Sequence, residues 1–439
     1  MLFSMAFVLG ALLAIVATAK LLQHRGVLAG EGSRKLVHVG MGCICLSFPW
    51  LFDEPLHVAV LALIAALGLW ALRHVTWLRP WKTVLHQVDR QSMGDIFFPC
   101  AVALVFWLSA GDWVLYVLPI AILTVSDAVG ALVGKRYGQS RYLAEEGFKS
   151  AEGSVAFFLS AFLITHLTLL VATPIGRVES ILIGVLLGLF LVLVEAISWR
   201  GLDNLFLPVA CFVLLKVVVQ NSIGELATDV VILAGMCIVL VVLRRTTALT
   251  QTATFGVALI LFLSWSVGGW RWIAAPIAGV VGYALLTPGG PGRRSPRNNA
   301  QAVLAVSAPG LFWLFTSANQ QTEVWIFPYG LSFAANLGMV ALCYFRHGNR
   351  ASRFALSAAI GIGFFVPLFP YLCMWPDWRS LRFAAAAVVI LTIAIISFDR
   401  LQPGMADCPT DGKRWLRQGA IAFLASLAAA GVTVRLLHL

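Results

Sequence analysis

One carboxylate, Asp127, interrupts a long apolar stretch of the sequence, and small residues follow it at helical spacing. Gly130 or Ala131, Gly134 and Gly138 come next on the same side of a helix, so this face carries an acid and then nothing larger than a methyl group. Such a face lets another helix pack closely. An ionisable group inside a membrane segment is instead typical of a functional site, because its charge must be paired or hydrated. We therefore predict that the glycines pack a helix and that Asp127 is catalytic.

A second polar cluster, Lys149-Ser150-Ala151-Glu152-Gly153-Ser154, precedes the next apolar run. Ser150 or Ser154 can cap a helix there. Free N–H groups at a helix N-terminus suit a phosphate, and Lys149 adds a positive charge. An ordinary cap on a membrane helix accounts for the serines equally well. The run GALVGK just before the cluster is one residue short of a Walker phosphate loop and lacks its Ser or Thr.

A third cluster, EAISWRGLDN, leaves one apolar run and enters another. Glu195 is embedded near the end of the first run, which favours a functional role. Together with Asp127, Glu195 and Asp203 provide three carboxylates that could share a Mg²⁺ ion on a nucleotide, because Mg²⁺ prefers oxygen ligands and is usually shared with phosphates. A helix cap explains Asp203 and Asn204 equally well.

A histidine, His38, follows the basic pair Arg34-Lys35 at the start of another apolar run. We interpret Arg34 and Lys35 as the positive flank of a membrane helix. His38 lies deeper than such a flank requires, so it could bind a phosphate oxygen or relay a proton. A packed histidine at a helix start is the alternative.

The composition defines the elements that must position these residues. Hydrophobic residues make up 60% of the 439 residues and charged residues 12%, and apolar runs of about 17 to 22 residues recur along the whole chain. This pattern predicts an all-α polytopic membrane protein with about 15 to 16 transmembrane helices. The first run, Leu2 to Ala19, is expected to be a retained helix because it lacks a basic n-region. The eight cysteines mostly lie in apolar runs, so they are read as buried hydrophobic residues.

The basic residues define the expected orientation. Lys and Arg total 31 against 20 Asp and Glu, and they concentrate in loops that alternation of the spans places on one face, which indicates membrane topology rather than nucleic-acid binding. The positive-inside rule makes that face cytoplasmic, in what we expect to be a bacterial inner membrane. The loop after Gly134 and Lys135 then opens toward nucleotides, which makes these two residues candidate nucleotide contacts. The basic loops cover residues 23–35, 73–90, 135–149, 199–204, 244–245, 288–299, 346–353 and 399–417.

The two halves of the chain differ in their acids. After residue 245 every acid falls in a predicted loop, whereas Asp127 and Glu195 of the first half lie inside apolar runs. We therefore predict a catalytic membrane domain at residues 1–245 and an accessory membrane domain at 246–439. Nothing in the sequence sets the oligomeric state.

Four blocks, RKLVHVGMG, SDAVGALVGKRYG, KSAEGSVAFF and VEAISWRGLDNLFLPVA, occur in this order within residues 1–245. In this they resemble the polyprenol kinase family, the dolichol and phytol kinases that phosphorylate isoprenoid alcohols with CTP. The resemblance implies CTP as co-substrate and roles with metal or substrate for Asp127, Glu195, Asp203 and Asn204. The linker between the second and third blocks is shorter than in the family. Residues that the resemblance assigns to the nucleotide are Lys149, Ser150, Glu152, Gly153 and Ser154.

The expected reaction is therefore phosphoryl transfer from CTP to a lipid alcohol, with membrane lipids around the chain. Asp127 is expected to orient the hydroxyl, Lys149 to stabilise the transferring group, and Mg²⁺ to bridge the phosphates. The apolar tail of the alcohol is expected to lie between helices, along the small-residue face that follows Asp127. Two other functions explain many of the same features. A cytidylyltransferase acting on a lipid phosphate would use a similar site, although its C-terminal signature is absent. A lipid transporter or flippase would also carry embedded acids, but the motif blocks gather at one face rather than at the membrane midplane.

Overall fold

The computed structural model describes residues 2–27, 31–75, 93–145, 147–243, 249–287, 298–347, 354–368, 370–371, 378–402 and 412–437. Within these ranges, ten helices are long and apolar enough to cross a membrane, and four further apolar helices are shorter. The apolar runs of the sequence form helices in these ranges. The prediction of an all-α polytopic membrane protein is confirmed. Basic-loop positions 28–30, 76–90, 146, 244–245, 288–297, 348–353 and 403–411 lie outside the described residues.

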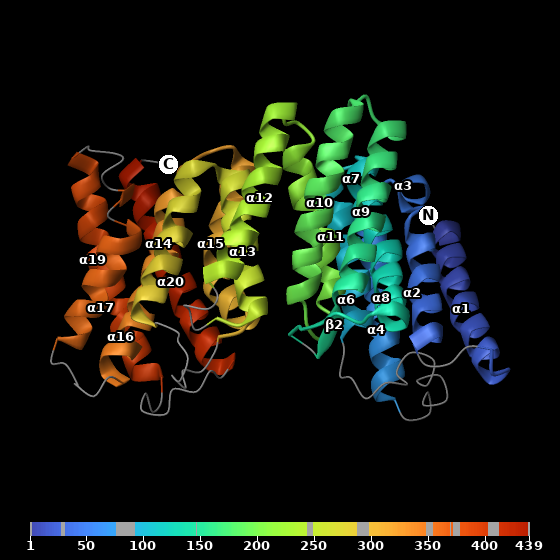
Figure 1. Cartoon of the computed structure of the whole chain (residues 1–439), viewed down its shortest axis with the longest axis horizontal. Coiled ribbons are helices and arrows are strands. Elements are labelled where there is room, and N and C mark those ends of the chain that lie inside the picture. The colour runs from blue at the N-terminus through green and yellow to red at the C-terminus, as the bar shows by residue number, and fades with distance from the viewer. Residues whose placement is uncertain are drawn as a thin grey trace. The chain divides into compact units, whose positions relative to one another are not determined.

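The chain divides into two compact units, Met1–Val231 and Ile232–Leu439. The boundary falls inside helix α12 (Ile223–Leu243), whereas the sequence placed it near residue 245. The elements of unit 1 can be followed in Figure 1. They are α1 (Leu2–His24), α2 (Glu31–Cys45), α3 (Phe48–Leu51), α4 (Pro55–His74), α6 (Gly94–Ser109), α7 (Trp113–Ala121), η2 (Ile122–Ser126), α8 (Asp127–Tyr137), β1 (Arg141–Leu143), β2 (Phe148–Ser150), α9 (Ala151–Ala172), α10 (Arg177–Ile197) and α11 (Asp203–Val218).

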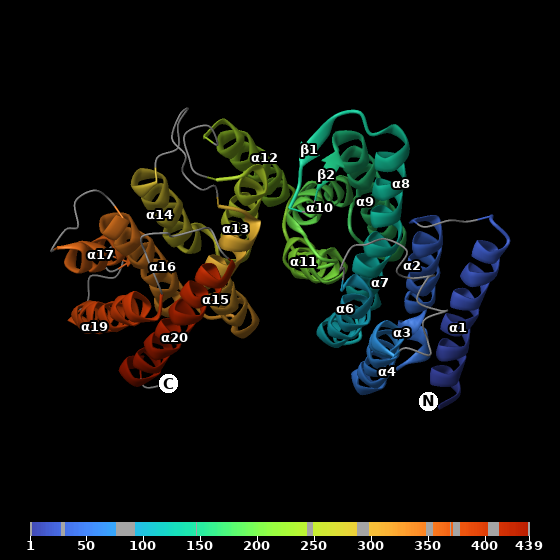
Figure 2. The same cartoon turned by 90° about the horizontal axis from the view of Figure 1, so that it is seen from below.

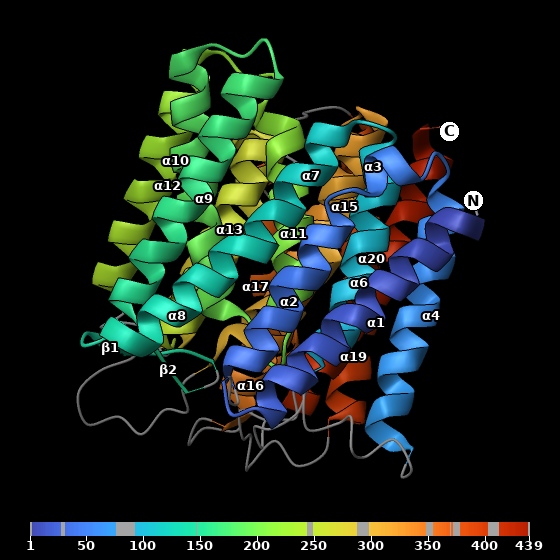
Figure 3. The ribbon, with the colours of Figure 1, turned by 90° about the vertical axis from the view of Figure 1, so that its right-hand side faces the viewer.

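Successive long helices of unit 1 run in opposite directions, as Figure 3 shows. The start of α2, the end of α8, the β1–β2 hairpin and the start of α9 therefore lie at the same end of this unit. The two short strands pair antiparallel, with Tyr142 opposite Lys149. The polar clusters of the sequence are thus collected at one end by the alternation of apolar helices.

The glycine face of α8 packs directly against α9. A Cβ atom added to Gly153 would lie 2.8 Å from the carbonyl oxygen of Gly130 and 3.0 Å from the Cα atom of Gly134. Backbone on both sides leaves no room for larger side chains, which confirms that the glycines pack a helix. The same contact corrects one expectation, because a face filled by α9 has no space for the chain of a lipid substrate.

Gly130 gives a direct test of this crossing. A Cβ atom there would lie 3.1 Å from the Cβ atom of Phe157 and 3.2 Å from the carbonyl oxygen of Gly153. We expect Gly130→Val to destabilise the protein by about 1 to 3 kcal/mol, since overpacking forces the two helices apart. Thermal unfolding in detergent would measure this. Gly68→Val in α4 is the matched control, because a Cβ at Gly68 meets nothing within 4 Å; equal effects of both substitutions would contradict the close crossing.

A π-helical turn, η2, immediately precedes Asp127. Its Thr124 side chain lies so close to α2 that a Cβ atom on Gly42 would overlap it. Single π-helical turns within α-helices are frequent at functional sites. The wide turn and the glycine bring α2 against the start of α8, which places Lys35 and His38 near Asp127.

Unit 2 is built around α16, which contacts α14, α15, α17, α19 and α20. Figure 2 shows α16 among these neighbours. Nearly all of its residues are buried, so α16 forms the core of this unit. The elements are α13 (Gln251–Gly268), α14 (Trp270–Leu286), α15 (Ala300–Gln320), α16 (Ile326–His347), α17 (Ala355–Gly363), η4 (Phe364–Leu368), α19 (Trp378–Leu401) and α20 (Gly412–Leu437).

Candidate active site

The first part of the site is an ion pair between α2 and α8. Lys35 Nζ lies 2.5 Å from Asp127 Oδ2, and the two side chains are 5% and 14% exposed. Lys35 also donates to the backbone carbonyl of Asp127 at 3.3 Å. The positive charge that a buried carboxylate requires is therefore supplied from the neighbouring helix.

His38 supports the same carboxylate from one helical turn further along α2. Its Nε2 atom lies 3.1 Å from the carbonyl oxygen of Leu123 and 3.5 Å from Asp127 Oδ2. Because a carbonyl oxygen can only accept a hydrogen bond, Nε2 carries the proton in this arrangement. Both contacts of this nitrogen are thus internal, and His38 fixes the π-helical turn rather than presenting Nε2 to a phosphate.

Asp127 keeps one oxygen for another partner. All of its hydrogen bonds with described side chains go to Oδ2, and no described residue bonds Oδ1. An ionised carboxylate can accept on both oxygens. The geometry therefore leaves a fixed acceptor that can hold a hydroxyl group.

The second part of the site is another ion pair, formed between the hairpin and α10. Lys149 Nζ lies 2.6 Å from Glu195 Oε1 and also donates to the Glu195 backbone carbonyl. Burial alone would lower the pKa of Lys149, but the Glu195 carboxylate and its hydrogen bond outweigh burial and hold the pKa above its ordinary value. An ammonium group has three donors, of which Glu195 uses two. Lys149 therefore stays charged and has one donor to offer.

The start of α9 is capped from within the chain. Ser150 Oγ accepts from the Gly153 N–H at 3.1 Å, as the N-cap interpretation predicts, and the Ala151 N–H donates to the carbonyl of Ser140 at 2.9 Å. Glu152 accepts from the Ser140 N–H at 3.0 Å. These amides are therefore occupied, so the helix start is not the open anion cradle that the sequence allowed.

Ser154 joins the hairpin to α9. Its hydroxyl lies 2.8 Å from the Tyr142 hydroxyl, and burial raises the pKa of Tyr142 although this hydrogen bond lowers it. Tyr142 thus remains protonated near neutral pH. Together with Ser150 and Glu152, this contact fixes the strand that carries Lys149.

Asp203 and Asn204 form the start of α11. The Asn204 side chain donates to the carbonyl of Gly94 at 2.9 Å, which joins the start of α11 to the start of α6. Asp203 Oδ1 accepts from the Asn204 N–H, and the Asp203 charge acts on both His38 and Lys149. The N-cap position of α11 is Leu202, so neither residue is the N-cap, although Asp203 binds one first-turn N–H of the helix.

Comparisons of the sequence with known proteins identify a family. A phytol kinase from Synechocystis sp. is 30% identical over 205 residues, which are 44% of this chain and 82% of that protein. The chain belongs to the polyprenol kinase family. A probable chloroplastic phytol kinase from Oryza sativa subsp. japonica is 27% identical over 234 residues, 48% of this chain and 73% of that protein. No family model and no solved structure matches the chain.

Membership in the polyprenol kinase family makes the chain a lipid alcohol kinase, and the fold brings the family's four motif blocks together. Lys35, which the sequence analysis treated as a helix flank, is the partner of Asp127. Its spacing of three residues from His38 places both on one helix face, which was the available signal. Gly134 lies in the α8–α9 crossing, whereas Lys135 is exposed and makes no contact with a described residue.

The predicted three-carboxylate metal site is not preassembled. No three His, Cys, Asp or Glu side chains of the described ranges lie together in a group that could hold a metal ion. Asp127 and Glu195 are instead each bound to a lysine. These residues do not fit a dedicated protein-bound Mg²⁺ ion.

The Lys149–Glu195 pair has a defined pH dependence. Because the pKa of Lys149 is raised in the fold, the stabilisation by this pair is complete below the ordinary lysine value of about 10.4 and is lost only as pH rises through the raised pKa. The difference in melting temperature between wild type and Lys149→Gln should stay constant from about pH 6 to 9. A difference that shrinks within this window would mean that Lys149 loses its proton there.

Proposed function

We propose that this chain transfers the γ-phosphoryl group of CTP to the hydroxyl of an isoprenoid alcohol such as phytol, dolichol or another polyprenol. The names of the two relatives support the alcohol, and the four motif blocks, which resemble those of CTP-using kinases, support the donor. The observation that carries the proposal is that the buried Asp127 has one carboxylate oxygen free. This acid lies at the same end of unit 1 as the ion-paired Lys149.

Asp127 is the residue that acts on the alcohol. With Oδ2 held by Lys35 and His38, Oδ1 accepts the hydrogen bond of the substrate hydroxyl and orients its oxygen toward phosphorus. As the new oxygen–phosphorus bond forms, the bond to CDP breaks and the hydroxyl proton passes to Asp127. Lys35 keeps the carboxylate ionised before the reaction.

Lys149 is the residue that acts on the phosphate. Its remaining N–H can donate to an oxygen of the transferring group, where negative charge must be stabilised. Glu195 and the hairpin position this donor. Positioning and charge neutralisation are the main contributions that phosphoryl transfer requires from a protein.

Mg²⁺ is proposed to arrive with the nucleotide. The ion supplies charge neutralisation of the phosphates when it is bound. Asp203 is the protein group best suited to face it, because Lys35 and Lys149 already occupy Asp127 and Glu195. The basic loops support, by the positive-inside rule, the proposal that this end of the chain faces the cytoplasm from a bacterial inner membrane.

The test is turnover by the purified full-length chain in lipid nanodiscs. CTP or ATP labelled at the γ-phosphate is offered with phytol, dolichol or a shorter polyprenol. We expect label on the lipid with CTP and an isoprenoid alcohol. Label in pyrophosphate together with a lipid phosphate acceptor would indicate cytidylyl transfer instead, and nucleotide turnover with no acceptor would contradict a lipid alcohol kinase.

A further inference from the structure

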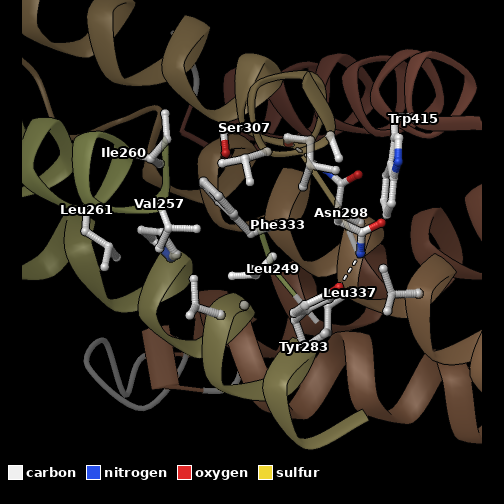
Figure 4. Close-up of a pocket in the computed structure, with 18 residues that line it drawn as sticks. Leu249, Val257, Ile260, Leu261, Tyr283, Asn298, Ser307, Phe333, Leu337 and Trp415 are labelled. Carbon is white, nitrogen blue, oxygen red and sulfur yellow. Dashed lines mark hydrogen bonds between the residues drawn. The ribbon is translucent and has the colours of Figure 1, made fainter. Parts of the chain in front are cut away.

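Unit 2 contains an apolar, partly open cavity among its helices. Its volume is about 110 Å³, and its lining comes from α13, α14, α15, α16 and α20. Figure 4 shows Val257, Phe333 and Leu337 around it. For comparison, an engineered apolar cavity of about 150 Å³ binds a benzene molecule. The space therefore suits the end of a hydrocarbon chain rather than a polar metabolite.

Two of the polar side chains in the lining satisfy each other. Asn298 donates through its amide nitrogen to the Tyr283 hydroxyl, the dashed contact in Figure 4. The other polar groups of the lining include Asn336 and Ser307.

Asn336 is a buried amide with an unused acceptor. The residue is 2% exposed, and its Nδ2 atom donates to the carbonyls of Val306 at 3.0 Å and Ser332 at 2.8 Å. Those two bonds fix the orientation of the amide, while its Oδ1 atom has no hydrogen-bond partner. A buried acceptor without a partner is costly, and Asn336 lines the cavity, so a ligand that supplies a donor to Oδ1 would remove this cost.

Ser307 adds a second polar group to the same lining. It follows Val306, whose carbonyl binds Asn336, and it is 4% exposed. Its hydroxyl makes no hydrogen bond with any described residue. A hydroxyl can both donate and accept, so a ligand hydroxyl could donate to Asn336 Oδ1 and accept from Ser307.

We propose that unit 2 binds a long-chain apolar alcohol, with its hydroxyl on Asn336 and Ser307 and its first carbons in the cavity. This is a second lipid site, built entirely from unit 2, and it does not depend on the proposed kinase reaction. The occupant is defined by its chemistry as one hydroxyl donor on a hydrocarbon chain. An unsubstituted hydrocarbon would leave Asn336 Oδ1 unpaired, and a charged lipid head group would find no counter-ion in the apolar lining.

Photo-crosslinking tests the site in the full-length chain without nucleotide. The probes are a hexadecanol that carries a diazirine near its hydroxyl and the matched hexadecane without the hydroxyl. We expect the alcohol to label α15 and α16 at a concentration about five- to tenfold lower than the alkane, which is the effect of one hydrogen bond. Equal labelling by both probes, or no labelling of these helices, would overturn the proposal.

Variants test the contributions of the cavity and of its polar groups separately. Asn336→Leu and Ser307→Ala should abolish or reduce the preference for the alcohol while alkane labelling persists. Gly279→Leu should block both probes, since a Cβ atom there meets only Phe333 at 3.9 Å and the added side chain fills the cavity. Gly361→Leu is the matched control, because a Cβ at Gly361 meets nothing within 4 Å. If Asn336→Leu does not fold, Ser307→Ala and Gly279→Leu still decide, and unchanged labelling in both would overturn the proposal.

Discussion

Asp127→Asn should lower kcat for lipid alcohol phosphorylation by at least about 100-fold, the range expected when a positioned general base is lost. Asparagine keeps the shape of the side chain but cannot take the hydroxyl proton. The substitution also leaves Lys35, which is 5% exposed, without its carboxylate. Loss of one partner of a buried ion pair costs about 3 to 5 kcal/mol, so the melting temperature should fall as well.

A double variant separates these two effects. In Lys35→Gln with Asp127→Asn the buried pair becomes two neutral amides, and stability should recover because no charge is left unpaired. Activity should not recover, since the base is still missing. Asp112→Asn is the matched control: Asp112 caps α7 by accepting from the N–H groups of Val114 and Leu115, and asparagine caps equally well. Activity that returns with stability in the double variant would assign Asp127 a purely structural role.

The sequence identified the two acids at the centre of the site for a general physical reason. An embedded carboxylate is expensive in hydrocarbon, so Asp127 and Glu195 stand out within apolar runs without any structural information. The same cost predicts that each acid has a positive partner. The identity of the partner is not predictable from local spacing, because Lys35 lies 92 positions from Asp127 and Lys149 lies 46 positions from Glu195.

The helices of the fold were predictable from the sequence, whereas the short strands that connect them were not. Long apolar runs predict spans by length alone, and the apolar runs form helices in the described ranges. Strands of three residues, such as β1 and β2, are too short to show an alternating pattern. The sequence therefore located Ser150 and Glu152 near the site but could not show that Ser150 caps α9 and Glu152 binds the Ser140 N–H rather than a phosphate.

The glycine face illustrates the same limit. Small residues after Asp127 predicted a closely packed helix, and α9 occupies that position. The sequence did not reveal which helix would pack there, and so the lipid chain was assigned to a face that α9 fills. A small-residue stripe therefore locates a close contact, while its partner follows from tertiary packing.

Replacement of Lys149 should produce the second large effect. Lys149→Gln should lower kcat/KM for CTP by about 100- to 1,000-fold, as the loss of a donor to a developing charge does in other enzymes. The expected loss lies in kcat rather than in KM alone, because the ammonium is most needed when charge builds on the transferring group. Lys216→Gln is the matched control, since Lys216 lies in the last turn of α11 and contacts Phe212 rather than the site.

Glu195→Gln tests whether Lys149 contributes to activity alone or as a pair with Glu195. If Glu195 serves to hold Lys149, each single substitution and the double Lys149→Gln, Glu195→Gln variant should lose similar activity, because residues that act as a unit are not additive. Steady-state kinetics of the three variants measures this coupling. Multiplicative losses in the double variant would mean that Glu195 acts on the nucleotide independently of Lys149. The 2.6 Å contact between the two side chains favours the coupled result.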